Sequence, residues 1–301
     1  MNDEEMPGEA PGSATIGNRI FVGLQHVLPQ HALSRLVHRI ARSRLPGLKN
    51  RLIGGFVRGF RPDMGDAVEP DPHRYASFND FFTRALKSGA RRVDTDPGVV
   101  VSPVDGIVSQ IGSLEAGRLL QAKNRYYALA DLMGGESKWT ERLAGGAFAT
   151  LYLAPYNYHR IHMPLGGRLV ASKFVPGRLF SVNAVTAASV AGLFARNERI
   201  VCIFQSDRTA FALVLVGALF VGSMATVWHG DVTPRRLRRP CDLPVDDVAS
   251  PLELPKGAEL GRFNMGSTVI LLFPPETIEW RAGLVAGSTV RVGEPIASLR
   301  P

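Results

Sequence analysis

The chain has 301 residues, of which 45% are hydrophobic, and it carries a formal net charge of +8. This composition excludes an intrinsically disordered chain and is sufficient for one large domain or two smaller ones. Two cysteines, Cys202 and Cys241, exclude a disulfide framework, so we expect a reducing, cytoplasmic setting.

Residues 1–17 are rich in Pro, Gly, Glu and Ser, which predicts a disordered tail. The chain begins Met-Asn-Asp-Glu-Glu, and this acidic start is the opposite of the basic start of a secretory signal.

Residues 18–62 predict basic amphipathic helices. Between positions 10 and 62 the chain has nine Lys and Arg and no acidic residue, and apolar residues recur at helical spacing on either side of Pro46-Gly47. Such helices suit the surface of an anionic membrane, but a helical hairpin packed on the domain has the same pattern. Nucleic acid is not the expected partner, because no exposed aromatics or known reading motif accompany the charge.

The remainder, 63–301, predicts a catalytic domain of α+β class with a mostly antiparallel β body. A short helix is expected at Phe78–Arg84, capped by Ser77 or Asn79. From Val99 the chain has many short β-rich runs and few helical patterns. The uncharged stretch Phe211–Trp228 has the length of a membrane span, but its internal glycines and β-branched residues favour two buried strands.

Three short stretches contain groups that could perform chemistry. His159 and His162 lie three residues apart and would share one face of a helical turn, and either could move protons near neutral pH. No third ligand recurs at metal spacing, so no metal site is predicted. Asp105-Gly106 is typical of a hairpin turn, but its carboxylate could also orient a histidine. Gly266-Ser267 precedes an apolar run and, on its own, is typical of a turn before a core strand.

Taken together, these stretches resemble the bacterial, membrane-associated, pyruvoyl-dependent phosphatidylserine decarboxylases. The resemblance extends from about residue 21 to residue 297, and six ordered segments carry it: Phe78–Arg84, Ser102–Gly112, Tyr152–Pro164, Val175–Asn183, Leu193–Arg199 and Gly261–Phe273. The family's self-cleavage motif matches Gly266-Ser267-Thr268 and not the second copy at 287–289. Met265 stands where the family usually has Leu, which changes little in volume.

The resemblance implies a proenzyme that cuts itself between Gly266 and Ser267 into chains 1–266 and 267–301. His162, oriented by Asp105, would take the proton of Ser267, and Ser267 would become the covalent pyruvoyl group. That group would form a Schiff base with phosphatidylserine, and His159 would reprotonate the carbon after loss of CO₂. Tyr152 and Ser181 would line the substrate pocket.

The same resemblance implies a peripheral protein on the cytoplasmic face of the cell membrane, attached through residues 18–62. It also implies that the two chains stay together and that the assembly is a homodimer. Two alternatives remain open from the residues alone. One is a serine hydrolase that uses Asp105, His162 and Ser267 on external substrates, and the other is a non-enzymatic barrel-sandwich module suggested by residues 283–296.

Overall fold

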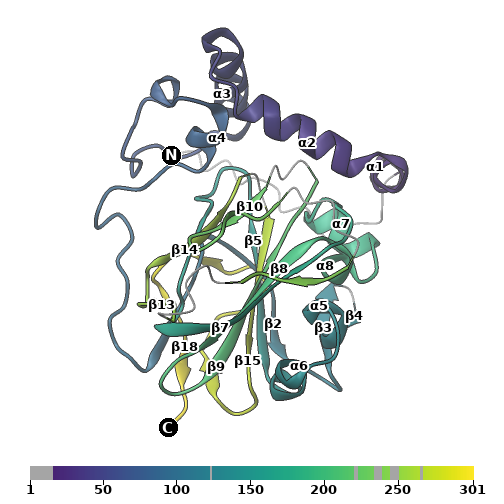
Figure 1. Ribbon diagram of the computed structural model, residues 1–301, viewed down its shortest axis with the longest axis vertical. Helices are drawn as coiled ribbons and strands as arrows, with labels where there is room; N and C mark the ends of the chain where they lie inside the picture. Colours follow the sequence, from purple (N-terminus) through teal and green to yellow (C-terminus); the bar gives the residue numbers. More distant parts are fainter. Residues whose placement is uncertain (1–15, 123, 220–222, 234–238, 245–250, 265–266) are drawn as a thin grey trace, which may run out of the picture.

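A computed structural model describes residues 16–122, 124–219, 223–233, 239–244, 251–264 and 267–301 (Figure 1). The tail predicted at 1–17 therefore lies outside the described residues up to position 15. Met265 and Gly266 also lie outside them.

The N-terminal region forms an outer helical layer above the β body (Figure 1). Its helices are α1 (Ile16–Val27), α2 (Gln30–Ala41), α3 (Pro46–Phe60) and α4 (Phe78–Phe82), with a 3₁₀ turn at Pro72–Arg74. Pro29 separates α1 from α2, and Pro46 begins α3, where its missing N–H costs no hydrogen bond. The side chain of Ser77 accepts the N–H of Asp80 and so caps α4. The sequence predicted helices on both sides of Pro46, but it did not single out α1.

The body is built on a nine-stranded antiparallel sheet. Its strand order is β12-β7-β8-β9-β15-β5-β2-β17, with β13 paired to β7. The strands are β2 (Gly106–Ser113), β5 (Ala147–Leu153), β7 (Gly167–Val175), β8 (Arg199–Gln205), β9 (Ala210–Val216), β12 (Cys241–Asp242), β13 (Glu253–Leu254), β15 (Ser267–Phe273) and β17 (Thr289–Val290). The α+β class with a mostly antiparallel body is thus confirmed.

Three smaller sheets complete the body. One has the order β11-β10-β14-β6, one has β1-β18-β16, and the third is the hairpin β3-β4. Their strands are β1 (Val99–Val101), β3 (Arg118–Ala122), β4 (Arg125–Ala128), β6 (Arg160–His162), β10 (Met224–Thr226), β11 (Gly230–Asp231), β14 (Glu259–Phe263), β16 (Ile278–Trp280) and β18 (Pro295–Leu299).

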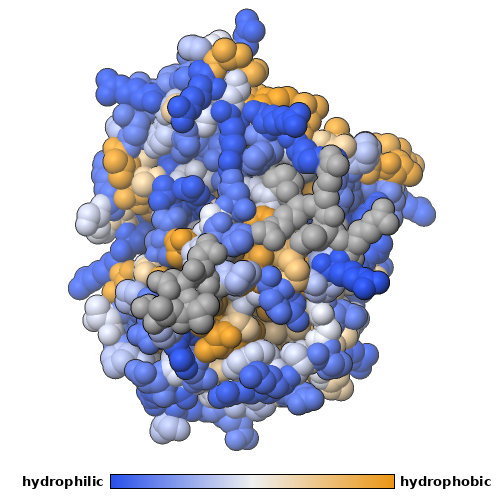
Figure 2. All heavy atoms as spheres, in the orientation of Figure 1, coloured by the Kyte–Doolittle hydropathy of each residue, from blue (hydrophilic) through white to orange (hydrophobic). Residues whose placement is uncertain are grey.

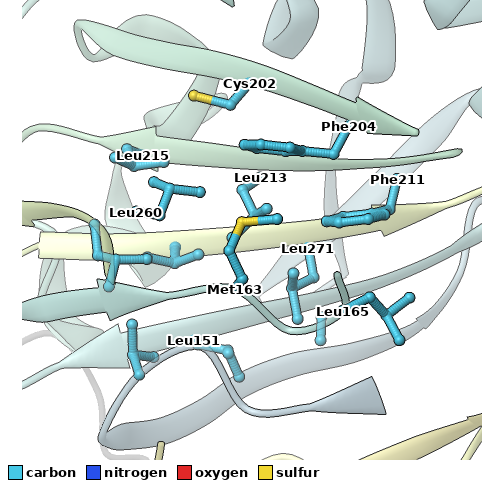
Figure 3. Close-up of a cluster of buried hydrophobic side chains, with 14 of the residues drawn as sticks. Leu151, Met163, Leu165, Cys202, Phe204, Phe211, Leu213, Leu215, Leu260 and Leu271 are labelled. Carbon is cyan, nitrogen blue, oxygen red and sulfur yellow. The ribbon is translucent and has the colours of Figure 1, made fainter. Parts of the chain in front are cut away.

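Both faces of the large sheet are buried, because its strands alternate between two cores. In β9, Leu213 and Leu215 belong to one core, while Val214 and Val216 belong to the other. The first core packs against the sheet of β6 and β14, and Figure 3 shows Leu213, Phe211 and Leu271 around Met163, which follows β6. The second packs against β3, β4 and the helices α5 (Leu129–Met133), α6 (Lys138–Leu143), α7 (Ala184–Ser189) and α8 (Leu193–Arg196).

Three local expectations are settled by this architecture. The first half of the stretch 211–228 is the buried strand β9, as predicted. In the part of the chain that the structure describes, no helix is both long and apolar enough to cross a bilayer.

Asp105-Gly106 is not a hairpin turn, because β1 pairs with β18 whereas β2 pairs with β5 and β17. His159 and His162 do not share a helical face, since His162 belongs to strand β6 and His159 precedes it.

Candidate active site

Ser267 is the first residue of β15, a strand that lies between β9 and β5 in the middle of the large sheet. It pairs with Leu153 of β5, and its side chain is fully buried. Strand alternation places it on the same face as Val269 and Leu271, which belong to the core shared with β6 and β14. Among the described residues, its hydroxyl oxygen Oγ has no hydrogen-bond partner.

A buried hydroxyl without a partner is unusual, because burial normally requires a hydrogen bond. Such a group calls for an explanation, and a reactive role is one of them. A residue that loses its hydroxyl and becomes a keto group also fits here, since no hydrogen bond among the described residues is lost in the conversion.

His159 is held as a neutral imidazole by its surroundings. Its Nδ1 lies 2.8 Å from the carbonyl oxygen of Asn157, so Nδ1 carries the proton and donates it. Burial lowers the pKa of His159 to about 3, and the nearby Arg84 cation acts in the same direction. The other ring nitrogen, Nε2, is buried and has no partner in the described part of the chain, so its lone pair is available to accept a proton.

The position of the His159 ring is set by its neighbours in the fold. The turn before it is closed by Asn157, whose side-chain oxygen accepts the N–H of Ala154 at 2.8 Å. The carbonyl of His159 accepts the N–H of Phe263 at the end of β14. The Phe82 ring of α4 lies against the imidazole, with ring centroids 4.1 Å apart. The outer helical layer therefore touches the candidate site through Phe82.

His162 has both ring nitrogens engaged, which distinguishes it from His159. Its Nδ1 lies 2.8 Å from the carbonyl oxygen of Gly257, and its Nε2 lies 3.0 Å from the hydroxyl of Tyr158. Burial raises the pKa of Tyr158, so the phenol stays protonated and donates to Nε2. Burial lowers the pKa of His162, while the Asp105 carboxylate acts weakly in the opposite direction.

Asp105 is bound to an arginine in this structure. Arg91 donates to the carboxylate from Nε at 3.0 Å and from Nη2 at 2.5 Å, and it also pairs with Asp66 at 2.7 Å. The N–H of Val292 donates to the same carboxylate at 2.9 Å. The sequence predicted that Asp105 orients His162, but among the described residues the two side chains do not hydrogen-bond: Nδ1 of His162 bonds to the Gly257 carbonyl, and the Asp105 carboxylate accepts two N–H groups of Arg91.

Tyr152 and Ser181 lie on the wall of the same cavity, which has a volume of about 230 Å³. Tyr152 pairs with Thr268, the residue after Ser267. The cavity lies between α3, α4, the end of β5 and the segment 181–183, and its lining is Phe56, Phe60, Phe82, Tyr152, Leu153, Pro155, Ser181, Val182, Asn183, Ala218 and Leu219. Leu153 and Phe82 connect it to the site, since one pairs with Ser267 and the other packs on His159.

Arg84 lies close enough to His159 to affect its pKa, and the sequence alone did not indicate this. Its side chain is only 3% exposed, and its Nη2 donates to the carbonyl of Tyr156 at 3.1 Å. Its Nε and Nη1 have no partner among the described residues, and burial lowers its pKa. In the sequence it is one of several basic residues near the end of a helix, and only the long-range packing distinguishes it.

Comparisons with known proteins agree on one family. A family model described as phosphatidylserine decarboxylase matches residues 78–298, and a second model, PSD, matches residues 20–61. A phosphatidylserine decarboxylase proenzyme of Ectopseudomonas mendocina is 50% identical over 92% of this chain and 96% of its own length. Those of Bordetella pertussis and Methylococcus capsulatus are 50% and 48% identical, over 93% and 95% of this chain and 94% and 99% of their own lengths. Neither the serine hydrolase nor the barrel-sandwich alternative receives such support.

Proposed function

Because the chain belongs to the phosphatidylserine decarboxylase family, we propose that it cuts itself between Gly266 and Ser267 and that Ser267 is its pyruvoyl residue. The activity itself is that of the family: the proenzyme cleaves itself, forms a serine-derived pyruvoyl group and converts phosphatidylserine to phosphatidylethanolamine. The observation that carries the assignment is the place of Ser267: it is buried at the start of β15, it pairs with Leu153 of the cavity wall, and its Oγ has no hydrogen-bond partner among the described residues.

In the cleavage step, the Oγ of Ser267 bonds to the carbonyl carbon of residue 266, and the bond from that carbon to the Ser267 nitrogen breaks. The proton of the hydroxyl passes to a histidine and then to the released nitrogen, which leaves an ester between the two chains. Loss of the α-proton of residue 267 then breaks its Cβ–Oγ bond, so that residue 266 leaves as a carboxylate, and water converts the dehydroalanine at 267 to the pyruvoyl group with release of ammonia. We assign His162 as the base that takes the hydroxyl proton. Its Nε2 bonds to the Tyr158 hydroxyl, so that hydroxyl must turn away or pass the proton on. Burial lowers the pKa of His162, and the carboxylates of Glu259 and, more weakly, Asp105 oppose this by favouring the charged ring through space.

In the decarboxylation step, the pyruvoyl group supplies a carbonyl that can accept the electrons left when CO₂ departs. The chain's own contribution is a proton delivered to the substrate carbon, and we assign it to Nε2 of His159. Burial keeps Nε2 unprotonated at rest, and its lone pair has no partner among the described residues, so it first accepts a proton that the substrate ammonium gives up and then delivers that proton to the carbon. Phe82 excludes water from the ring, and Tyr152 and Ser181 form part of the proposed substrate cavity.

We also propose that α1 to α3 attach the protein to an anionic membrane on the cytoplasmic face. Figure 2 shows apolar side chains gathered along the rim above these helices. The exposed apolar residues of the three helices are Ile16, Ile20, Phe21, Leu24, Val27, Leu36, Ile40, Leu48 and Phe60. Exposed apolar groups next to Arg and Lys suit the boundary between acyl chains and anionic headgroups. Phe56 and Phe60 of α3, in the same helical layer, also line the proposed substrate cavity.

Denaturing mass spectrometry of the purified protein tests the proposed cut. It should give a fragment of 35 residues that begins at position 267, with a keto group in place of the N-terminal amine. An intact chain that still decarboxylates the lipid would refute the assignment, and so would labelling of intact Ser267 by a fluorophosphonate. Sedimentation velocity of the cut protein tests the proposed homodimer, in which each half keeps both of its chains.

A further inference from the structure

The connection between α1 and α2 buries two glutamines against the β body. Gln25 is 1% exposed and Gln30 is 3% exposed, although Gln is a residue that normally faces water. Pro29 lies between the two helices, and both glutamine side chains reach the same short segment of the body. A buried amide is stable only where its oxygen and nitrogen find partners.

Both glutamines bind one short segment of the body, which we call the wall segment and define as residues 179–183. The Oε1 of Gln30 accepts the N–H of Leu179 at 2.9 Å, and the Oε1 of Gln25 accepts the N–H of Ser181 at 2.7 Å. Alternate N–H groups of an extended chain point the same way, so the two amides act as a substitute for a neighbouring strand. The Nε2 of Gln30 donates to the backbone carbonyl of Gln25 at 2.7 Å, which ties the two together.

A third amide holds the wall segment from the opposite side. The Oδ1 of Asn197 accepts the N–H of Phe180 at 3.0 Å, and its Nδ2 donates to the carbonyl of Phe180 at 2.8 Å. Just before the segment, Arg178 donates to the carbonyl of His26, and His31 lies 2.9 Å from the carbonyl of Gly177. The segment is therefore fixed on both sides by side chains, and one of these sides belongs to the outer helical layer.

The wall segment leads directly to the proposed substrate cavity. Ser181, Val182 and Asn183 form one side of that cavity, opposite Phe82 and Leu153. On α1, the side chains of Ile20 and Leu24 are exposed, whereas Gln25 points inward. The outer face of α1 therefore exposes apolar residues, while its inner face holds the wall segment that forms part of the cavity.

We propose that Gln25 and Gln30 are positioning residues, which hold the wall segment in the shape that binds phosphatidylserine. The contact of α1 and α2 with the wall segment then controls substrate binding, while the outer faces of the same helices attach to the membrane. If the helices lift, Leu179 and Ser181 lose their acceptors and the wall segment is free to move. This inference rests on the proposed function, because it takes the cavity to be part of the substrate site.

The test uses the self-cleaved full chain with Gln25→Met and Gln30→Met, which keep the length of the side chain and remove the acceptor oxygen. The substrate is a short-chain, water-soluble phosphatidylserine, so membrane attachment is not needed. We expect KM to rise about fivefold in each variant, the loss expected for one neutral hydrogen bond, with kcat little changed. The control Leu24→Ser, on the outer side of α1, should leave this KM unchanged.

Amide hydrogen exchange separates positioning from a general loss of stability. In the Met variants, the amides of Leu179 and Ser181 should exchange faster, while those of β15 stay protected. Unchanged exchange at these two amides, or an unchanged KM, would overturn the proposal. The 35-residue keto fragment is measured in the same samples. If the wild type lacks it, the proposed function fails; if it is present and the variants match the wild type, only the positioning role fails.

Discussion

The outer helical layer and the β body arrange their apolar residues in opposite ways. Every residue of β9 and of β15 is buried, and all but Ser267 and Thr268 are apolar. In α1 the only buried residue is the polar Gln25, and in α2 the buried residues are Gln30, Ser34 and Ala41. The body follows the usual rule that apolar side chains are removed from water. The first two helices invert that rule, which is expected if their outer face meets lipid.

The comparison predicts that the residues whose bonds break and form lie in the body. Ser267→Ala removes the hydroxyl that starts cleavage, so we expect an intact chain with no pyruvoyl group and no decarboxylation. Ser288→Ala is the matched control, because Ser288 belongs to the second Gly-Ser-Thr copy and its Oγ accepts the N–H of Val285. Gel electrophoresis and phosphatidylethanolamine formation measure both. Normal processing of Ser267→Ala would move the cut site elsewhere.

Removal of each of the two histidines of the body should affect a different step, either cleavage of the chain or decarboxylation. His159→Ala removes the free Nε2, and we expect turnover to fall about a hundredfold or more while most of the chain is still cut. His162→Ala should chiefly slow cleavage, since that ring is the assigned base of the first step. Time courses of chain cutting, together with turnover per keto group, measure the two effects. If both steps fail equally in His159→Ala, the division between the histidines is wrong.

Replacing a leucine should lower the free energy of unfolding much more in the body than in the outer helical layer. Leu271→Ala in β15 leaves a cavity in the core and should lower the free energy of unfolding by about 3 kcal/mol. Leu24→Ser in α1, where the side chain is 52% exposed, should change it by no more than about 0.5 kcal/mol. The same Leu24→Ser should weaken binding to anionic vesicles about tenfold, the loss expected for one leucine withdrawn from lipid. Unchanged vesicle binding would assign the membrane contact to another surface.

How far the sequence could predict each region follows from the range of the interactions involved. Apolar runs and breakers such as Pro46 are local, so the strands and the basic helices could be predicted. The surroundings of Asp105 could not, because Arg91 and Val292 reach it from distant parts of the chain. The same holds for Gln25, whose partner Ser181 is 156 residues away. His159 and His162 could be identified from the sequence as proton carriers. Only the fold shows that Nε2 of His159 has no partner among the described residues, whereas both ring nitrogens of His162 are hydrogen-bonded.

Two buried groups of the body, His159 near α4 and Glu198 next to α2, should respond to pH with opposite signs. Burial lowers the pKa of His159 from 6.5 to about 3, so between these values the unfolded chain binds a proton that the folded chain does not. Its contribution to stability is complete above pH 6.5 and is lost as the pH falls, by about 1.4 kcal/mol per pH unit. Glu198 lies beneath α2, with its carboxylate 3.8 Å from His31, and burial raises its pKa from 4.5 to about 8. Its contribution is complete below pH 4.5 and is lost as the pH rises toward 8.

Urea unfolding between pH 4 and 8 distinguishes the two groups when each is removed in turn. Relative to the wild type, His159→Phe should lose less stability on acidification below pH 6.5, because the ring that must be protonated on unfolding is gone. Glu198→Gln should lose less stability as the pH rises above 4.5, because an amide does not titrate. The comparison of each variant with the wild type cancels the titration of the other group, which is present in both proteins. Identical pH profiles for a variant and the wild type would mean that the group in question is not held in the protonation state that its burial implies.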